Sequence, residues 1–153
     1  MHPTFIITFL ASFLIWLLFA GLFVLWIIDG KIKKEQVLHA LMAAIIAWGA
    51  TQMLKSIVPS TRPFIKNGRP ELTLTTHSDN AFPSSHTAIA FAIATTVWLH
   101  DKRLGAGFLL GALLVGIGRI LGNVHYPLDI LAGGIIGSIT AFALEKIHFP
   151  LDT

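Results

Sequence analysis

The chain has 153 residues, of which 54% are hydrophobic and only 12% are charged, and its formal net charge is +3. A soluble domain carries about 25% charged residues, and so few charges could not keep the surface of a short chain wetted, which excludes an ordinary soluble domain. The absence of cysteine excludes disulfides and thiolate metal sites. The length suits one domain, and we expect residues 1–153 to form a single membrane domain.

The first predicted element is an uncharged run from Phe5 to Ile28. It is longer than the apolar region of a signal peptide, which has about 7–15 residues, and no basic residue precedes it. Lys31, Lys33 and Lys34 follow it, in the arrangement of a stop-transfer signal. We therefore interpret this run as a retained transmembrane helix.

Four more apolar segments follow, and crossing about 30 Å of hydrocarbon takes roughly 20 residues. The predicted fold class is an all-α integral-membrane bundle of about five transmembrane helices. The predicted spans are Phe5–Ile28, Gln36–Leu54, Ser84–Leu99, Leu104–Gly118 and about Leu128–Leu144. The last two are short, and each contains a GxxxG pair, Gly107 with Gly111 and Gly133 with Gly137. Such pairs let helix backbones approach closely, although glycine is also common in membrane helices generally.

Five spans place the two termini on opposite sides of the membrane, so the loop charges predict the orientation. Six basic residues lie at short loops or helix ends on one side: Lys31, Lys33, Lys34, Lys102, Arg103 and Lys146. The other side holds five, Lys55, Arg62, Lys66, Arg69 and Arg119, so the raw count barely discriminates. Several of these five fall in the motif described below, whereas the six have no other evident task, and the positive-inside rule then places the side with six in the cytoplasm. We therefore expect the N-terminus, the 55–83 segment and the 119–127 loop outside, and the C-terminus inside.

Two clusters of polar residues flank the long, proline-containing segment from Pro59 to Pro83. Loops of that length without regular structure are usually functional or disordered. The first cluster runs from Lys55 to Arg62-Pro63; a lysine at a helix end is alternatively an interfacial anchor. The second is Pro83-Ser84-Ser85-His86, a helix start whose free N–H groups suit an anion, or alternatively a capping sequence with an incidental histidine.

The third cluster runs from Gly118-Arg119 to His125 and Asp129. His125 and Asp129 are four residues apart, which places them on one face of a helical start. A carboxylate in that position can hold an imidazole in one tautomer and stabilise its cation. The alternative is a structural His–Asp pair that closes a loop.

Together the clusters contain three cations, two histidines, a helix N-terminus and one aspartate, which suit phosphoryl transfer. Catalysis of that reaction consists largely of positioning and charge stabilisation. One histidine can attack phosphorus and the other can protonate the leaving oxygen. The carboxylates Glu71, Asp79 and Asp129 are dispersed along the chain, so we expect no metal cofactor.

These clusters resemble the signature of the type 2 phosphatidic acid phosphatase superfamily, which also contains the vanadium haloperoxidases: K-x6-RP, then PSGH, then SR-x5-H-x3-D. The chain departs from it at Ser85, in place of glycine, and at Gly118, in place of serine. The common membrane members have six spans, one more than predicted here. The resemblance implies that His125 is a nucleophile that forms a phosphohistidine, that Asp129 orients it and that His86 is the general acid. The residues that would bind phosphate at the outer interface are Lys55, Arg62, Ser84, Ser85 and Arg119.

The substrate inference rests on two stretches, Asn80 to His86 and Val124 to Ile130, which look like the small bacterial undecaprenyl-diphosphate phosphatases. The resemblance implies a multi-pass protein of the bacterial cytoplasmic membrane, with a membrane lipid and the bilayer as partners, no nucleic acid and no cofactor. Phosphatidylglycerophosphate, phosphatidate and lipid A phosphatases share the motifs and are alternatives. A haloperoxidase is a further alternative, and so is a non-enzymatic transporter or lipid-binding scaffold. A non-enzymatic protein would not explain two histidines and three cations at these spacings.

Overall fold

The computed structural model describes residues 3–28, 31–74 and 80–146, and every regular element in them is a helix. The order is α1 (Pro3–Thr8), a π-helical turn η1 (Phe9–Phe13), α2 (Leu14–Ile28), α3 (Lys31–Ile57), α4 (Pro63–Asn67), α5 (Ser85–His100), α6 (Lys102–Leu121) and α7 (Pro127–Leu144). The predicted all-α membrane bundle is confirmed. The segment between Pro59 and Pro83, for which we expected no regular structure, contains the short helix α4.

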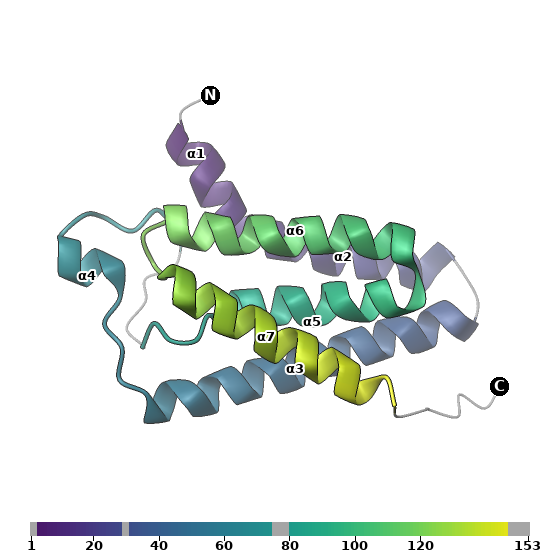
Figure 1. Ribbon diagram of the computed structural model, residues 1–153. Coiled ribbons are helices and arrows are strands. Elements are labelled where there is room, and N and C mark those ends of the chain that lie inside the picture. The colour runs from purple at the N-terminus through teal and green to yellow at the C-terminus, as the bar shows by residue number, and fades with distance from the viewer. Residues whose placement is uncertain (1–2, 29–30, 75–79, 147–153) are drawn as a thin grey trace.

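Helix α5 forms the centre of the bundle, and α3, α6 and α7 pack around it (Figure 1). Small side chains let three of these helices approach closely: Ala43 and Ala47 of α3, Ala88 and Ala92 of α5, and Ala141 of α7 form one buried cluster. Large apolar side chains point outward instead, and Ile27, Ile28 and Met53 are each more than 60% exposed. An apolar exterior around a core of small residues is the arrangement expected of helices that pack in lipid.

Four helical segments in the described part of the chain are long and apolar enough to cross a membrane: Thr4–Ile28, Lys34–Ile57, Lys102–Leu121 and Pro127–Leu144. The remaining predicted span, Ser84–Leu99, corresponds to α5, which has only 16 residues. At 1.5 Å per residue, α5 is about 24 Å long, shorter than the hydrocarbon layer of about 30 Å. Its neighbours surround it, so the start of α5 lies at the bottom of a recess rather than at the surface.

The glycine pair of α7 packs as predicted, whereas the pair of α6 does not. A Cβ at Gly133 or Gly137 would overlap the backbone of α5, at Ser84 and Ala88 respectively. In contrast, Gly107 has open space beside it, and Gly111 meets only the side chain of Leu18. The GxxxG prediction is therefore right for α7 and wrong at Gly107, because no described residue elsewhere in the fold comes within 4 Å of the position that a Cβ would take there.

Candidate active site

The three polar clusters meet in one pocket of about 180 Å³ at one end of the bundle. The ends of α3 and α6 and the starts of α5 and α7 converge there, on the left in Figure 1. The pocket is lined by Trp48, Gln52, Lys55, Arg62, Ser85, His86, Ile89, Arg119 and His125. The described lining therefore contains three cations and two imidazoles and no carboxylate, a set of donors that suits a multiply charged anion.

Asp129 holds the imidazole of His125 from behind. His125 Nδ1 lies 3.3 Å from Asp129 Oδ2, and both side chains are buried. The same oxygen accepts a 2.8 Å hydrogen bond from the backbone N–H of Tyr126. Pro127 begins α7 and places Asp129 in its first turn, so the four-residue spacing brings the carboxylate to the ring as expected. If Nδ1–H donates to Asp129, the Nε2 lone pair of His125 is left to face the pocket.

Burial lowers the pKa of His125 from its ordinary value of 6.5, and the charges of Arg119 and Arg62 lower it further, against the opposing effect of Asp129. The imidazole is therefore neutral at neutral pH, and only the neutral form has a lone pair with which to attack phosphorus.

This shift predicts the pH dependence of activity. If His125 is the nucleophile, as the family resemblance implies, its protonation would abolish attack, and the acid limb of kcat/KM in the free enzyme should lie below pH 6.5. A series of initial rates across the acid range, corrected for ionisation of the substrate, measures it. A half-maximal point at or above pH 6.5 would contradict a nucleophilic His125 with a depressed pKa.

Two of the cations are held by one backbone carbonyl that the sequence reasoning did not single out. Lys55 Nζ donates to the carbonyl oxygen of Asn80, and Arg62 Nη2 lies 3.5 Å from the same oxygen. In turn, Asn80 Nδ2 donates to the carbonyl oxygen of Lys55 at 2.7 Å, and Asn80 Oδ1 accepts from the backbone N–H of Ser60 at 3.0 Å. Arg62 also donates to Val124 O at 3.0 Å and lies 3.4 Å from His125 Nε2. Asn80 thus connects the first cluster to the residues just before the second cluster. Its position just before Phe82-Pro83 could have suggested this role.

Arg119 is held by the π-helical turn η1, which follows α1. Its Nη1 donates to the carbonyl oxygen of Ala11 at 3.1 Å, and the side chain is 1% exposed. Ala11 lies in the π-helical turn η1, and π-helical turns often occur at functional sites. The adjoining Gly118 explains one departure from the family pattern, because a Cβ there would lie 2.6 Å from the carbonyl carbon of Leu10 and 2.7 Å from the amide nitrogen of Ala11.

Gly118→Ser should therefore destabilise the protein by about 1–3 kcal/mol, as overpacking against rigid backbone does. Thermal unfolding in detergent measures the effect. Gly107→Ser is the matched control on the same helix, because its added atoms meet open space. A similar change in Tm for both variants would contradict the packing explanation.

The two serines of the second cluster have different environments. Ser84 is fully buried, and its hydroxyl accepts from Thr87 N at 3.4 Å and from Thr87 Oγ1 at 3.0 Å, so it caps α5 and does not line the pocket. Ser85 does line the pocket, and its hydroxyl is hydrogen-bonded to that of Thr51 on α3 at 2.9 Å. Where the family pattern has glycine, this chain therefore adds a hydroxyl fixed by a neighbouring helix.

Three further residues that the sequence analysis did not single out line the pocket: Trp48, Gln52 and Ile89. Their spacing could have indicated this position. Gln52 precedes Lys55 by three residues and Ile89 follows His86 by three, which places each pair on one helix face. Asp79, one of the dispersed carboxylates named above, lies outside the described residues.

A bundle of membrane-spanning helices with a buried His–Asp pair and a cationic pocket at one end defines a membrane-embedded lipid phosphatase domain, a hydrolase. The chain belongs to the PAP2 superfamily, whose family model matches residues 36–152.

Relatives and solved structures agree with this membership. The chain is 32% identical over 136 residues to the bacitracin transport permease protein BcrC of Bacillus licheniformis, an alignment that covers 89% of this chain and 67% of that protein. It is 28% identical to the undecaprenyl-diphosphatase BcrC of Bacillus subtilis, covering 79% of this chain and 62% of that protein. The crystal structure of Aquifex aeolicus LpxE superposes with a TM-score of 0.74 at 29% identity, covering 96% of this chain and 88% of that one. The chain thus spans about two thirds of the length of these two curated relatives.

Proposed function

We propose that this protein hydrolyses undecaprenyl diphosphate to undecaprenyl phosphate and phosphate at the outer face of a bacterial cytoplasmic membrane. The observation that carries the proposal is a cationic pocket with two histidines that adjoins an apolar groove on the lipid-facing side of the bundle. The name of the Bacillus subtilis relative supports the choice of substrate.

The apolar groove runs along α2 and α3, away from the pocket. The pocket shares Trp48 and Ile89 with a groove of about 290 Å³, which in turn shares Phe19 and Leu41 with a second groove of about 380 Å³ that reaches Val37. From Trp48 to Val37 the path follows eleven residues of α3, or about 16 Å at 1.5 Å per residue. A long isoprenoid chain could lie along this path while its diphosphate occupies the pocket.

The proposed reaction has two steps. In the first, Nε2 of His125 attacks the terminal phosphorus, the bond from that phosphorus to the bridging oxygen breaks, and His86 donates a proton to the departing oxygen of undecaprenyl phosphate. In the second, His86 removes a proton from water, which attacks the phosphohistidine and releases phosphate together with neutral His125. Asp129 stabilises the transient positive charge on the ring.

The remaining site residues stabilise the negative charge that develops on the transferred phosphoryl group. Lys55, Arg62 and Arg119 neutralise its oxygens. Ser85 adds its hydroxyl and the free N–H groups at the start of α5, and Ser84 contributes by capping that helix. No step uses a metal ion.

The distribution of charge supports the proposed orientation. Lys34 and Lys102 lie at the end of the bundle opposite the pocket, where they stack over Trp26 and Trp98 at 6.0 and 4.9 Å from the ring centroids. Basic residues paired with tryptophans are typical of a membrane interface, and an excess of them marks the cytoplasmic side. The pocket end then faces outside. A cysteine introduced at Asn67 should react with an impermeant reagent added from outside, and one introduced at Lys34 should not.

The decisive experiment measures phosphate release by purified protein in detergent with a chelator present. Undecaprenyl diphosphate, phosphatidylglycerophosphate and phosphatidate are compared side by side. The highest kcat/KM is expected for undecaprenyl diphosphate, and chelation should leave the rate of the chemical step unchanged. Inactivity on all three substrates would refute the enzyme proposal, and a preference for a glycerophospholipid would refute the substrate assignment.

The name of the Bacillus licheniformis relative raises a second candidate, transport of bacitracin. A transporter needs a passage through the bundle, but the space between α3, α5 and α7 is filled by the alanine cluster, whose members are 0–1% exposed. Phosphate release without any flux of bacitracin in proteoliposomes would favour hydrolysis, and flux without phosphate release would favour transport.

Filling the groove with a larger side chain should weaken binding of long isoprenoid substrates and leave short ones unaffected. Leu41→Trp introduces a larger side chain where the two apolar grooves adjoin, so we expect KM for undecaprenyl diphosphate to rise roughly tenfold. The same variant should leave a short-chain isoprenoid diphosphate unaffected. Leu110→Trp, at a position on α6 that is 60% exposed and lines none of these cavities, is the control. An equal effect on both chain lengths would contradict the groove assignment.

A further inference from the structure

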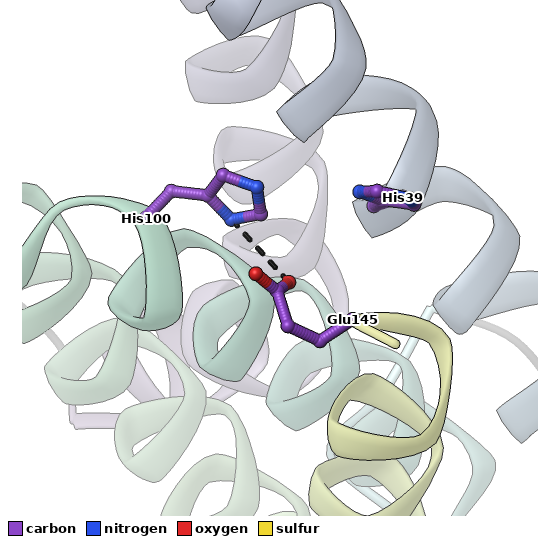
Figure 2. Close-up of side chains that lie close together, drawn as sticks. All are labelled: His39, His100 and Glu145. Atoms are coloured by element: carbon purple, nitrogen blue, oxygen red, sulfur yellow. Dashed lines mark ion pairs between the residues drawn. The ribbon is translucent and has the colours of Figure 1, made fainter. Parts of the chain in front are cut away.

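A second cluster of potential ligands lies at the opposite end of the three helices that carry much of the catalytic pocket. His39 of α3, His100 at the end of α5 and Glu145 just after α7 converge, as Figure 2 shows. One ligating atom from each residue lies within 4.8 Å of the others. The two imidazole rings have centroids 6.0 Å apart, and His39 is buried. The three residues are far apart in the sequence, so their convergence is a product of the fold.

The hydrogen bond made by His100 prepares its ring to act as a ligand. Its Nδ1 lies 3.0 Å from the carbonyl oxygen of Thr96, one turn earlier in α5, and a carbonyl can only accept. Nδ1 therefore carries the hydrogen, and Nε2 has a free lone pair. Metal-binding histidines almost always donate their other ring N–H to a carbonyl, carboxylate or water in this way.

Glu145 has a charge that the neighbouring histidine does not satisfy. Its Oε2 lies 3.7 Å from His100 Nδ1, too far for a hydrogen bond, and the Nδ1 hydrogen already points to Thr96. The Glu145 side chain is 37% exposed, but this oxygen is buried and has no hydrogen-bond partner in the described part of the chain. A buried carboxylate oxygen without a donor is costly, so a cation in the centre of the cluster would stabilise it.

We propose that His39, His100 and Glu145 bind one Zn²⁺ ion. Two imidazole nitrogens and one carboxylate oxygen form a set of three protein ligands known for zinc, and the fourth position would take water. The ion would join α3, α5 and α7, and the other ends of these helices carry Lys55, His86 and Asp129. His86 and His100 are fourteen residues apart on α5, which puts the two sites about 21 Å apart. The ion is therefore a structural clamp with no part in the phosphoryl transfer proposed above, and the inference does not depend on that function.

The test measures metal binding directly. Protein purified in detergent, with any histidine tag removed, is stripped with a chelator and titrated with Zn²⁺ by calorimetry. A parallel titration with Co²⁺ reports tetrahedral coordination through its visible absorption. We expect one ion per chain and a Tm that rises with zinc concentration, because a ligand that binds only the folded state stabilises it.

Three variants locate the ion. His39→Ala, His100→Ala and Glu145→Gln should each weaken zinc binding by more than about tenfold, since even groups that only support metal ligands have effects of 10–100-fold. Because His39 is buried, the isosteric Glu145→Gln at a partly exposed helix end keeps the test valid if His39→Ala does not fold. His77→Ala controls for adventitious binding to histidine and should leave the affinity unchanged. The proposal is overturned if the wild-type protein binds no zinc, or if Glu145→Gln and His100→Ala bind it as tightly as wild type.

Discussion

His125→Ala should lower the rate of phosphate release by at least about a thousandfold, the scale seen when a covalent nucleophile is removed. Without Nε2 the phosphoryl group has no acceptor on the protein, and water would have to attack directly in a pocket arranged for a ring. The cations and the groove would persist, so KM should change far less than kcat. Measurements of initial rates over a range of substrate concentrations separate the two.

The covalent step can be observed separately. Substrate labelled in its terminal phosphate should transfer label to the wild-type protein through an acid-labile, base-stable bond, as expected for phosphohistidine. His125→Ala should carry no label. Because burial and the His–Asp pair make some loss of stability possible, Tm and protection by inorganic phosphate confirm that the variant is folded and keeps its anion site. Activity within tenfold of wild type in a folded variant would rule out His125 as the nucleophile.

Arg62→Ala should reduce kcat by about 10²–10³-fold, the cost of losing one preorganised donor to developing charge. Arg62 is 2% exposed and lies 3.4 Å from the proposed attacking nitrogen, so it is placed to bind the transferred phosphoryl group next to the nucleophile. Arg62→Lys should recover part of the activity, because it restores the charge without the fork-shaped pair of donors. Lys66→Ala, an exposed cation on α4, is the control and should change kcat little.

The same variant has a second readout that a purely structural role would not produce. The positive charge of Arg62 contributes to the lowered pKa of His125, so its removal should raise that pKa. The acid limb of kcat/KM would then move to higher pH in Arg62→Ala and stay in place in Lys66→Ala. An acid limb that stays in place in both variants would show that Arg62 does not act on the nucleophile electrostatically.

The helices were predictable because their signals are local. Runs of apolar residues long enough to cross a bilayer are almost always helical, since a backbone in lipid must satisfy its own hydrogen bonds. All five predicted segments are helical, although α5 is shorter than a full span. The His125–Asp129 contact was predictable for the same reason, because four residues at a helix start put both side chains on one face.

Contacts between distant segments were not predictable in this way. Nothing in the local pattern indicates that the carbonyl of Asn80 accepts from Lys55, that Ser84 turns away from the pocket while Ser85 lines it, or that Ala11 holds Arg119. Each of these depends on how closely helices pack, and that distance is set by small residues whose partners lie elsewhere in the chain. Gly118 illustrates this, because its lack of a side chain has a reason only once α6 rests against Leu10.

The sequence by itself thus determined the membrane class, the helical segments and the cationic, imidazole-containing signature, because composition and helical spacing act over a few residues. Only the tertiary structure decided which of those groups meet in one pocket, which carbonyls hold the cations and where a lipid chain could lie. It also brought His39, His100 and Glu145 together from three helices. The physical reason is that backbone hydrogen bonding and hydropathy specify each helix alone, whereas a site between helices exists only after their side chains have packed.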